Sequence, residues 1–260
     1  MTEKPLASFA LFNTEARIFH SVMLIQDFQI GVWFPFSYFN SDQAYPVLFV
    51  PDGEYAFPAV VGVIPTLIGA GEVPELLVVG IAYQGISGWQ EFGTLRDRDL
   101  CTQQFQGPGI ESRHAQYTRF FQEELFPLVE KHYRVNGSDR AIIGFSSAGF
   151  FSLEMLFTQP GMFRRHIAAS CTWPGAGEYF LKCAQHYAEG PAHPQTDLYL
   201  AVGSQDEEQV PRFNQLLEYM NKEKLPNLRL TGRVFEEEGH TAGMIGKTIL
   251  AGLRTVFKER

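Results

Sequence analysis

Residues 144–149, with the sequence Gly-Phe-Ser-Ser-Ala-Gly, constrain the fold of this chain more than any other feature. The apolar, β-branched residues 141–143 precede them, and a helix-prone run at residues 150–156 follows. This order predicts a strand, a sharp turn of small residues and then a helix, an arrangement that exposes a serine hydroxyl at the top of a sheet. Ser146 is the candidate nucleophile, although Ala148 stands where such turns usually carry glycine.

Ser147 is the rival for the position of the nucleophile. A nucleophile at position 147 would have Phe145 two residues before it, whereas Ser146 has Gly144 there. Because crowding in the turn favours glycine at that place, we assign the nucleophile to Ser146. The backbone N–H of Ser147 is then expected to help to form an oxyanion hole, which needs preorganised donors.

The second oxyanion donor is expected in the turn that follows residues 45–50, a predicted strand. This turn has the sequence Pro-Asp-Gly-Glu-Tyr, and Gly53 permits an unusual backbone conformation within it. The N–H of Gly53 or that of Glu54 is therefore the candidate. An ordinary strand-to-helix turn would use the same glycine.

Predicted strands and helices alternate from about residue 45 to the end of the chain. Such alternation indicates an α/β fold, with a mostly parallel sheet covered by helices on both faces. Residues 16–23 and 27–34 read as two strands close in sequence, so they predict an antiparallel hairpin at the edge of the sheet. No repeat or Gly/Ser-rich linker interrupts the chain, and we expect one domain over residues 1–260.

Residues 83–112 break the alternation and predict a long, functional loop. They follow the carboxyl end of a central strand, where open α/β sheets bind ligands. The substrate-binding residues that we expect here are Tyr83, Trp89, Phe92, Arg96, Arg98 and Phe105. The two arginines could bind an anionic substrate or pair with Asp97, Asp99 or the acidic residues before position 240, and we favour the pairing.

A serine nucleophile needs a base within hydrogen-bond reach, and the base needs a third group to orient it. Among the histidines after Ser146, only His240 follows directly after a predicted strand, residues 228–235, and precedes a helix. The other three are expected at the wrong end of the sheet or within a helix: His166, His186 and His193. We therefore predict that His240 is the base.

The acid is expected after the strand at residues 198–202. In folds that carry the serine nucleophile on a strand-to-helix turn, the order along the chain is serine, acid and histidine. Asp206 follows a glycine that leaves this strand. The neighbouring Glu207 and Glu208 could serve instead. Acidic residues here would also cap the next helix, so the assignment of Asp206 depends on its position in the chain.

The composition excludes several other classes of protein. A net charge of −8 without a basic run excludes an electrostatic nucleic-acid surface, and no apolar run is long enough for a membrane span. Cys101, Cys171 and Cys183 are odd in number and widely spaced, which favours a reducing compartment. With no secretory signal at the N-terminus, we expect a cytoplasmic protein. No metal-ligand spacing occurs, and no cofactor is expected.

Four further segments show a resemblance to a known family. Residues 45–54 look like its third strand and Asp-Gly turn, residues 96–100 like its Arg-x-x-Asp-Leu loop, residues 120–134 like the helix before its nucleophile strand, and residues 168–170 like the strand after it. The chain resembles the esterase branch of the α/β-hydrolases, which includes esterase D-like enzymes and siderophore esterases. Cys-Thr-Gln follows the loop at residues 101–103, where the family commonly has Thr-Pro.

The resemblance implies the α/β-hydrolase fold and a triad of Ser146, Asp206 and His240. The expected function is a serine hydrolase that cleaves small-molecule carboxylic esters through an acyl-enzyme intermediate. One alternative is an esterase for siderophore trilactones, and another is a noncatalytic binding protein that has kept the fold. The sequence is also compatible with a homo-oligomer.

Overall fold

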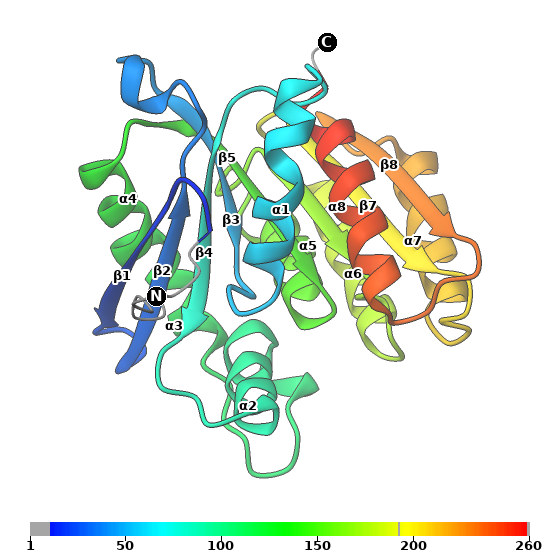
Figure 1. Ribbon diagram of the computed structural model, residues 1–260. Coiled ribbons are helices and arrows are strands. Elements are labelled where there is room, and N and C mark those ends of the chain that lie inside the picture. Colours follow the sequence, from blue (N-terminus) through cyan, green and yellow to red (C-terminus); the bar gives the residue numbers. More distant parts are fainter. Residues whose placement is uncertain (1–10, 192, 259–260) are drawn as a thin grey trace, which may run out of the picture.

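The computed structural model describes residues 11–191 and 193–258, and it contains one eight-stranded sheet in the order β1-β2-β4-β3-β5-β6-β7-β8 (Figure 1). β1 and β2 form an antiparallel hairpin, β2 pairs with β4 in antiparallel fashion, and all remaining pairs are parallel. The strands are β1 (Thr14–Ser21), β2 (Gln26–Trp33), β3 (Tyr45–Val50), β4 (Leu77–Tyr83), β5 (Val135–Phe145), β6 (Arg165–Ala169), β7 (Thr196–Gly203) and β8 (Leu228–Phe235).

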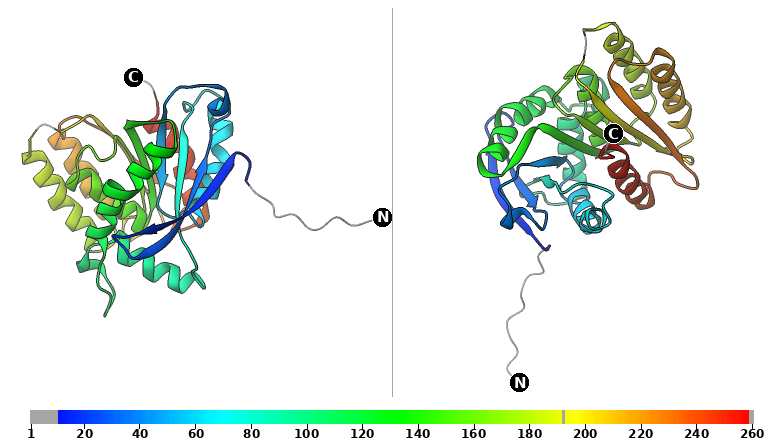
Figure 2. Two further views of the ribbon diagram at one scale, coloured as in Figure 1. Left: turned by 90° about the vertical axis from the view of Figure 1, so that its left-hand side faces the viewer. Right: turned by 90° about the horizontal axis from the view of Figure 1, so that it is seen from above.

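Helices cover both faces of this sheet (Figures 1 and 2). α1 and α8 pack on one face, while α3 to α7 pack on the other. The α-helices are α1 (Ala56–Gly69), α2 (Trp89–Leu100), α3 (His114–Arg119), α4 (Phe126–His132), α5 (Ser147–Thr158), α6 (Ala176–Glu189), α7 (Val210–Glu223) and α8 (Ala242–Val256). The predicted α/β fold and its antiparallel edge hairpin are thus confirmed.

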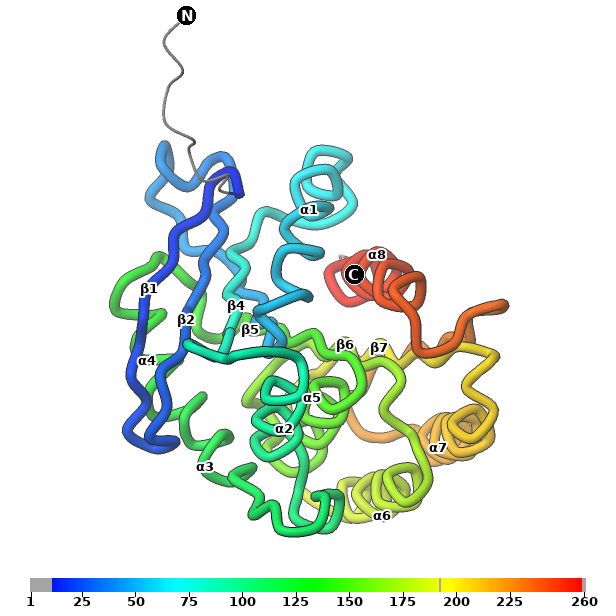
Figure 3. The backbone as a smooth tube through the Cα atoms, turned by 60° about the horizontal axis from the view of Figure 1, so that its bottom comes forward, coloured from blue at the N-terminus to red at the C-terminus, as the bar shows by residue number. Residues whose placement is uncertain are grey.

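Burial along the strands follows from these layers. Every residue of β6 and of β7 is buried, as expected for parallel strands covered on both faces. By contrast, β1 alternates between exposed and half-buried residues because it lies at the edge of the sheet. The parallel strands leave the sheet at one end, and this end carries α2 and the starts of α5 and α8 (Figure 3).

The prediction of a long loop over residues 83–112 was wrong. This segment contains the helix α2 and a short 3-10 turn, Gln103–Phe105. The hydrophobic pattern does not reveal α2 because its buried positions include the charged residues Arg96 and Asp99 beside Phe92 and Leu100. Arg96 pairs with Asp52 from another part of the chain, a contact that a local pattern cannot indicate.

The helix expected within residues 120–134 is present but irregular. A π-helical turn, Phe120–Leu125, separates α3 from α4. β5 also begins at Val135, before the apolar residues 141–143 that indicate it. Neither difference moves the turn that carries Ser146.

Candidate active site

The turn between β5 and α5 holds Ser146 in a strained backbone conformation, with φ 55° and ψ −122°. Such a conformation is costly for a residue with a side chain and persists only where the surroundings impose it. The Ser146 N–H donates to the carbonyl oxygen of Ala169 at 2.8 Å, and the Ser146 carbonyl accepts from the N–H of Phe150 at 2.7 Å. Both backbone groups of the serine are therefore fixed.

Two glycines allow the chain to make this turn. A Cβ atom added to Gly144 would lie 2.1 Å from the carbonyl oxygen of Ala148, and one added to Gly149 would lie 2.7 Å from that of Ala169. Ala148 is completely buried and packs with the core side chains of α3 to α5. Its methyl group does not line the cleft described next, so alanine in place of glycine leaves the site open.

Ser146 and His240 line one cleft of about 390 Å³ at the carboxyl end of the strands. The sequence predicted Trp89, Phe92 and Arg96 among its walls, and all three line it. It did not predict the other residues that line the cleft: Tyr55, Phe145, Ser170, Thr241, Met244 and Ile245. Met244 and Ile245 lie in the first turn of α8, which begins two residues after His240. Their place in the sequence could therefore have indicated that they line the cleft.

The loops that follow β7 and β8 carry the predicted acid and base. They lie against each other, because the N–H of Gln205 donates to the carbonyl oxygen of Glu238 at 2.8 Å. Asp206 is half-buried, and Ser170 Oγ donates to its Oδ2 at 3.4 Å, whereas Glu207 is exposed. Within the described residues, the ring of His240 has no hydrogen bond to Ser146 or Asp206.

The other downstream histidines lie away from the cleft. His166 is buried, its Nδ1 lies 2.8 Å from the carbonyl oxygen of Ser152, and burial lowers its pKa to about 4. The ring of His193 stacks on Tyr187 with 3.7 Å between the centroids. His186 lies on α6.

The turn after β3 carries Gly53 and Glu54, the two residues expected to supply the second oxyanion donor. The N–H of Gly53 donates to the carbonyl oxygen of Ile81 at 2.8 Å, so it is not available to a substrate. Gly53 and Glu54 line a separate cavity of about 610 Å³, whereas Tyr55, the next residue, lines the cleft. Glu54 accepts a hydrogen bond from the N–H of Tyr83, and burial raises the pKa of its carboxyl group to about 7.

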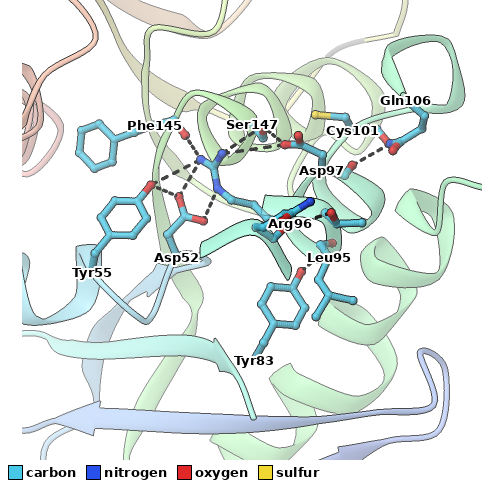
Figure 4. Close-up of polar contacts among 12 residues, drawn as sticks. Asp52, Tyr55, Tyr83, Leu95, Arg96, Asp97, Cys101, Gln106, Phe145 and Ser147 are labelled. Atoms are coloured by element: carbon cyan, nitrogen blue, oxygen red, sulfur yellow. Dashed lines mark hydrogen bonds and ion pairs between the residues drawn. The ribbon is translucent and has the colours of Figure 1, made fainter. Parts of the chain in front are cut away.

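Arg96 projects from α2 toward the serine turn and is only 9% exposed (Figure 4). Its Nε and Nη2 donate to the two carboxylate oxygens of Asp52 at 2.7 and 2.9 Å. Nη2 also donates to the carbonyl oxygen of Phe145 at 2.5 Å, and Nη1 donates to Ser147 Oγ at 3.1 Å. Burial alone would disfavour the charge, but the Asp52 carboxylate raises the pKa of Arg96 above its ordinary value.

Three of the predicted substrate-binding residues lie outside the cleft. Arg98 pairs with Asp99 at 2.7 Å, as the alternative interpretation expected. The hydroxyl of Tyr83 donates to Asp99 Oδ2 at 3.0 Å, and Tyr83 lines the separate cavity. Phe105 packs on Phe150 with 5.1 Å between ring centroids.

Within residues 11–191 and 193–258, no group of three or more His, Cys, Asp or Glu side chains is arranged to hold a metal ion. No helix in the same ranges combines the length and the apolar character that a membrane crossing requires.

Comparisons with known proteins identify the family of the chain and agree with its fold. The sequence model of the family described as "Putative esterase" matches residues 21–239. The ferri-bacillibactin esterase BesA of Bacillus subtilis (strain 168) is 25% identical over 225 residues, which are 75% of this chain and 73% of BesA.

Two solved structures share the fold. The BES protein from Bacillus cereus has a TM-score of 0.85 at 23% identity, with 100% of both chains covered. The siderophore hydrolase EstB from Aspergillus nidulans has a TM-score of 0.81 at 20% identity, covering 97% of this chain and 98% of EstB.

Proposed function

The chain belongs to the family described as "Putative esterase", and from this premise we propose that Ser146, His240 and Asp206 form its catalytic triad. The protein is a carboxylic-ester hydrolase whose substrate is a small-molecule ester. The observation that carries the proposal is the strained conformation of Ser146 at the wall of a cleft that it shares with His240.

The reaction then proceeds in two halves. His240 takes the proton from Ser146 Oγ, which attacks the ester carbonyl carbon, and the Ser147 N–H stabilises the oxyanion that forms. The protonated His240 gives its proton to the leaving alcohol, so the acyl group remains on Ser146. Water, deprotonated by His240, attacks this acyl-enzyme and releases the carboxylic acid together with the free serine.

Asp206 is the better candidate for the acid. Its half-buried carboxylate lies beside Ser170, which lines the cleft, whereas Glu207 is exposed to solvent. A carboxylate partly shielded from water orients an imidazolium more effectively than a fully solvated one. Catalytic hydrogen bonds often tighten only when substrate binds. We therefore expect the ring of His240 to lie between Ser146 and Asp206 in the substrate complex and to bond to both.

Tyr55 supplies the second oxyanion donor in this proposal. The N–H groups of two neighbours have other acceptors, since that of Gly53 bonds to Ile81 and that of Ala56 bonds to Asp52. Tyr55 also lines the cleft, whereas Glu54 lines the separate cavity. We therefore assign the donor for the developing negative charge to the Tyr55 N–H, at the start of α1.

The substrate that fits the cleft best is an uncharged ester with an aromatic or apolar group. Tyr55, Trp89 and Phe92 form an aromatic wall, with ring centroids between 5.3 and 6.1 Å apart. Asp52 neutralises the charge of Arg96 in the same cleft. The loop before His240 adds the exposed carboxylates of Glu236 and Glu237, which repel anions.

Ester-linked siderophores form the second candidate class. The similarity to BesA and to the Aspergillus nidulans hydrolase, both named for siderophore substrates, favours it. A ferric tris-catecholate is a polyanion and would need a cationic side chain in the cleft. The guanidinium of Arg96 is already hydrogen-bonded to the Asp52 carboxylate. We therefore rank this substrate below a neutral ester.

Turnover of p-nitrophenyl acetate by the wild-type protein and by Ser146→Ala tests the proposal. We expect turnover by the wild type and background hydrolysis by the variant, while equal rates would remove Ser146 from the mechanism.

A second assay compares the acetate with p-nitrophenyl hemisuccinate and ferric enterobactin. Preference for ferric enterobactin would reverse the ranking of substrates, and failure of a fluorophosphonate to label the folded protein would favour a noncatalytic binding protein.

The same proposal covers the setting of the enzyme. The free cysteines Cys101, Cys171 and Cys183 support a reducing compartment such as the cytoplasm. The net charge of −8 disfavours nucleic acid as a partner. The single sheet formed by all eight strands supports one catalytic domain over residues 1–260. A homo-oligomer is compatible with this arrangement, and sedimentation would reveal it.

A further inference from the structure

Arg96 contacts the serine turn on both sides of the nucleophile. Nη2 donates to the carbonyl oxygen of Phe145, the last residue of β5, and Nη1 donates to the hydroxyl of Ser147, the first residue of α5 (Figure 4). Ser146 lies between these two contacts. One side chain from α2 therefore fastens the two residues that flank the strained serine.

We infer that Arg96 is a positioning residue: it holds the backbone around Ser146 so that the serine hydroxyl and the Ser147 N–H face the cleft together. The inference rests on the proposed function, because it assigns Arg96 a role in the reaction of Ser146. It adds a role for the helix α2, which carries Arg96 across the end of the sheet.

No edge of the guanidinium has two N–H groups free for a substrate. Its Nε bonds to Asp52, its Nη1 to Ser147, and its Nη2 to both Asp52 and Phe145. The hydroxyl of Tyr55 donates to Asp52 Oδ2 at 2.6 Å and holds this carboxylate in place. Bidentate recognition of an anion needs two parallel N–H groups that are both available. The arginine is therefore arranged to bind the protein itself.

Ser147 is held by two neighbouring residues of α2. Its hydroxyl accepts from Arg96 and donates to Asp97 Oδ1 at 2.5 Å. These bonds determine the direction of the first residue of α5, and with it the direction of the Ser147 N–H. A preorganised donor costs no rearrangement at the moment of reaction, so loosening it slows the chemical step more than it weakens substrate binding.

The main test compares Arg96→Gln with the wild type on a neutral and an anionic ester, p-nitrophenyl acetate and p-nitrophenyl hemisuccinate. Loss of a direct oxyanion donor costs about 10²–10³ in kcat, so loss of its support is expected to cost about 10–100-fold. We expect this loss in kcat for both esters, with KM changed less than about threefold. Arg96→Lys should fail to restore the rate, because an ammonium cannot bridge Asp52, Phe145 and Ser147 at once.

Arg140→Gln is the matched control. Arg140 lies in the middle of the same strand β5, five residues before Phe145, where it pairs with Glu130 and lies over the ring of Phe126. Its substitution also removes an arginine ion pair, so it reports the general cost of such a loss. We expect kcat within about twofold of the wild type. Circular dichroism at the assay temperature checks that each variant is folded.

Ser147→Ala keeps the inference testable if Arg96→Gln does not fold. The change removes only the hydroxyl and leaves the backbone N–H in place. A smaller decrease in kcat, about three- to tenfold, is expected for this variant. In the double variant with Arg96→Gln, the two effects should not multiply, because both remove the same support.

The outcomes separate this inference from the proposed function. If the wild type hydrolyses neither ester and resists fluorophosphonate, the proposed function fails. If the wild type is active and Ser146→Ala is not, unchanged kcat in Arg96→Gln or in Ser147→Ala overturns the positioning role. A loss confined to KM for the hemisuccinate overturns it too, since that result makes Arg96 a receptor for substrate anions. The pH at half-maximal kcat/KM should be the same in Arg96→Gln and Ser147→Ala as in the wild type, because neither substitution changes His240.

Discussion

The serine turn and the loops that carry Asp206 and His240 form two sides of one cleft, and they are held in different ways. Ser146 has both backbone groups bonded, and the side chain of Arg96, which fastens the turn, is buried. His240 is exposed on its loop, and Asp206 is half-buried on the adjacent one. A nucleophile in a strained conformation needs rigid surroundings. The base instead exchanges protons in turn with the serine, the leaving alcohol and water during one reaction cycle.

The largest effect is expected from His240→Ala. Without the base, the rigid turn alone should not sustain the reaction, and kcat for p-nitrophenyl acetate should decrease by about 10⁴-fold or more. His193→Ala is the matched control, because that ring stacks on Tyr187 away from the cleft, and it should keep the wild-type rate. More than a few per cent of the activity left in His240→Ala would mean that another group serves as the base.

Asp206→Asn and Glu207→Gln show which carboxylate orients the base. We expect a loss of about 10²–10⁴ in kcat for the first variant and a change within about threefold for the second. Steady-state kinetics across the pH range gives both numbers. The reverse order would move the acid to Glu207 and would show that solvent exposure does not prevent that role.

Ala148→Gly probes the rigid side. The alanine methyl group is buried in the core, and glycine is a poorer helix former, so the free energy of unfolding should fall by about 1–2 kcal/mol. Because this methyl group does not line the cleft, kcat should stay within about twofold. Urea denaturation gives the first quantity, and ester turnover gives the second. A faster or broader-specificity enzyme would show that the methyl group limits the cleft after all.

The smallest effect is expected from Glu54→Gln, beside the serine side of the cleft. Burial raises the pKa of Glu54 to about 7 from its ordinary value of 4.5, so the folded protein binds the proton more tightly than the unfolded chain. The contribution of this group to stability is therefore complete below about pH 4.5 and is lost as the pH rises through about 7. Melting temperatures between pH 5 and pH 8 should fall more for the wild type than for the variant. Parallel curves would contradict the raised pKa.

The sequence predicts one kind of feature well, namely the order of elements and the loops that follow them. Residues 144–149 and the position of His240 after β8 depend on local patterns and on chain order, and both are readable without coordinates. The cleft walls at Trp89 and Phe92 were predicted for the same reason.

The contacts of Arg96 could not be predicted in this way. Its partner Asp52 lies 44 residues earlier in the chain, and α2 buries charged side chains, so no hydrophobic pattern reveals the helix. The unavailability of the Gly53 N–H depends on Ile81 in a neighbouring strand. Such features depend on contacts between residues that are far apart in the sequence, and local sequence patterns do not show which of these residues meet.

The identity of the nucleophile is the central claim, and covalent labelling tests it most directly. The folded wild-type protein is treated with a fluorophosphonate, its intact mass is measured, and the labelled peptide is sequenced by mass spectrometry. We predict one phosphonyl group per chain on Ser146 and none on Ser146→Ala, in which Ser147 is still present. A label on Ser147, a label that survives in Ser146→Ala, or no label on the folded wild type would contradict the account.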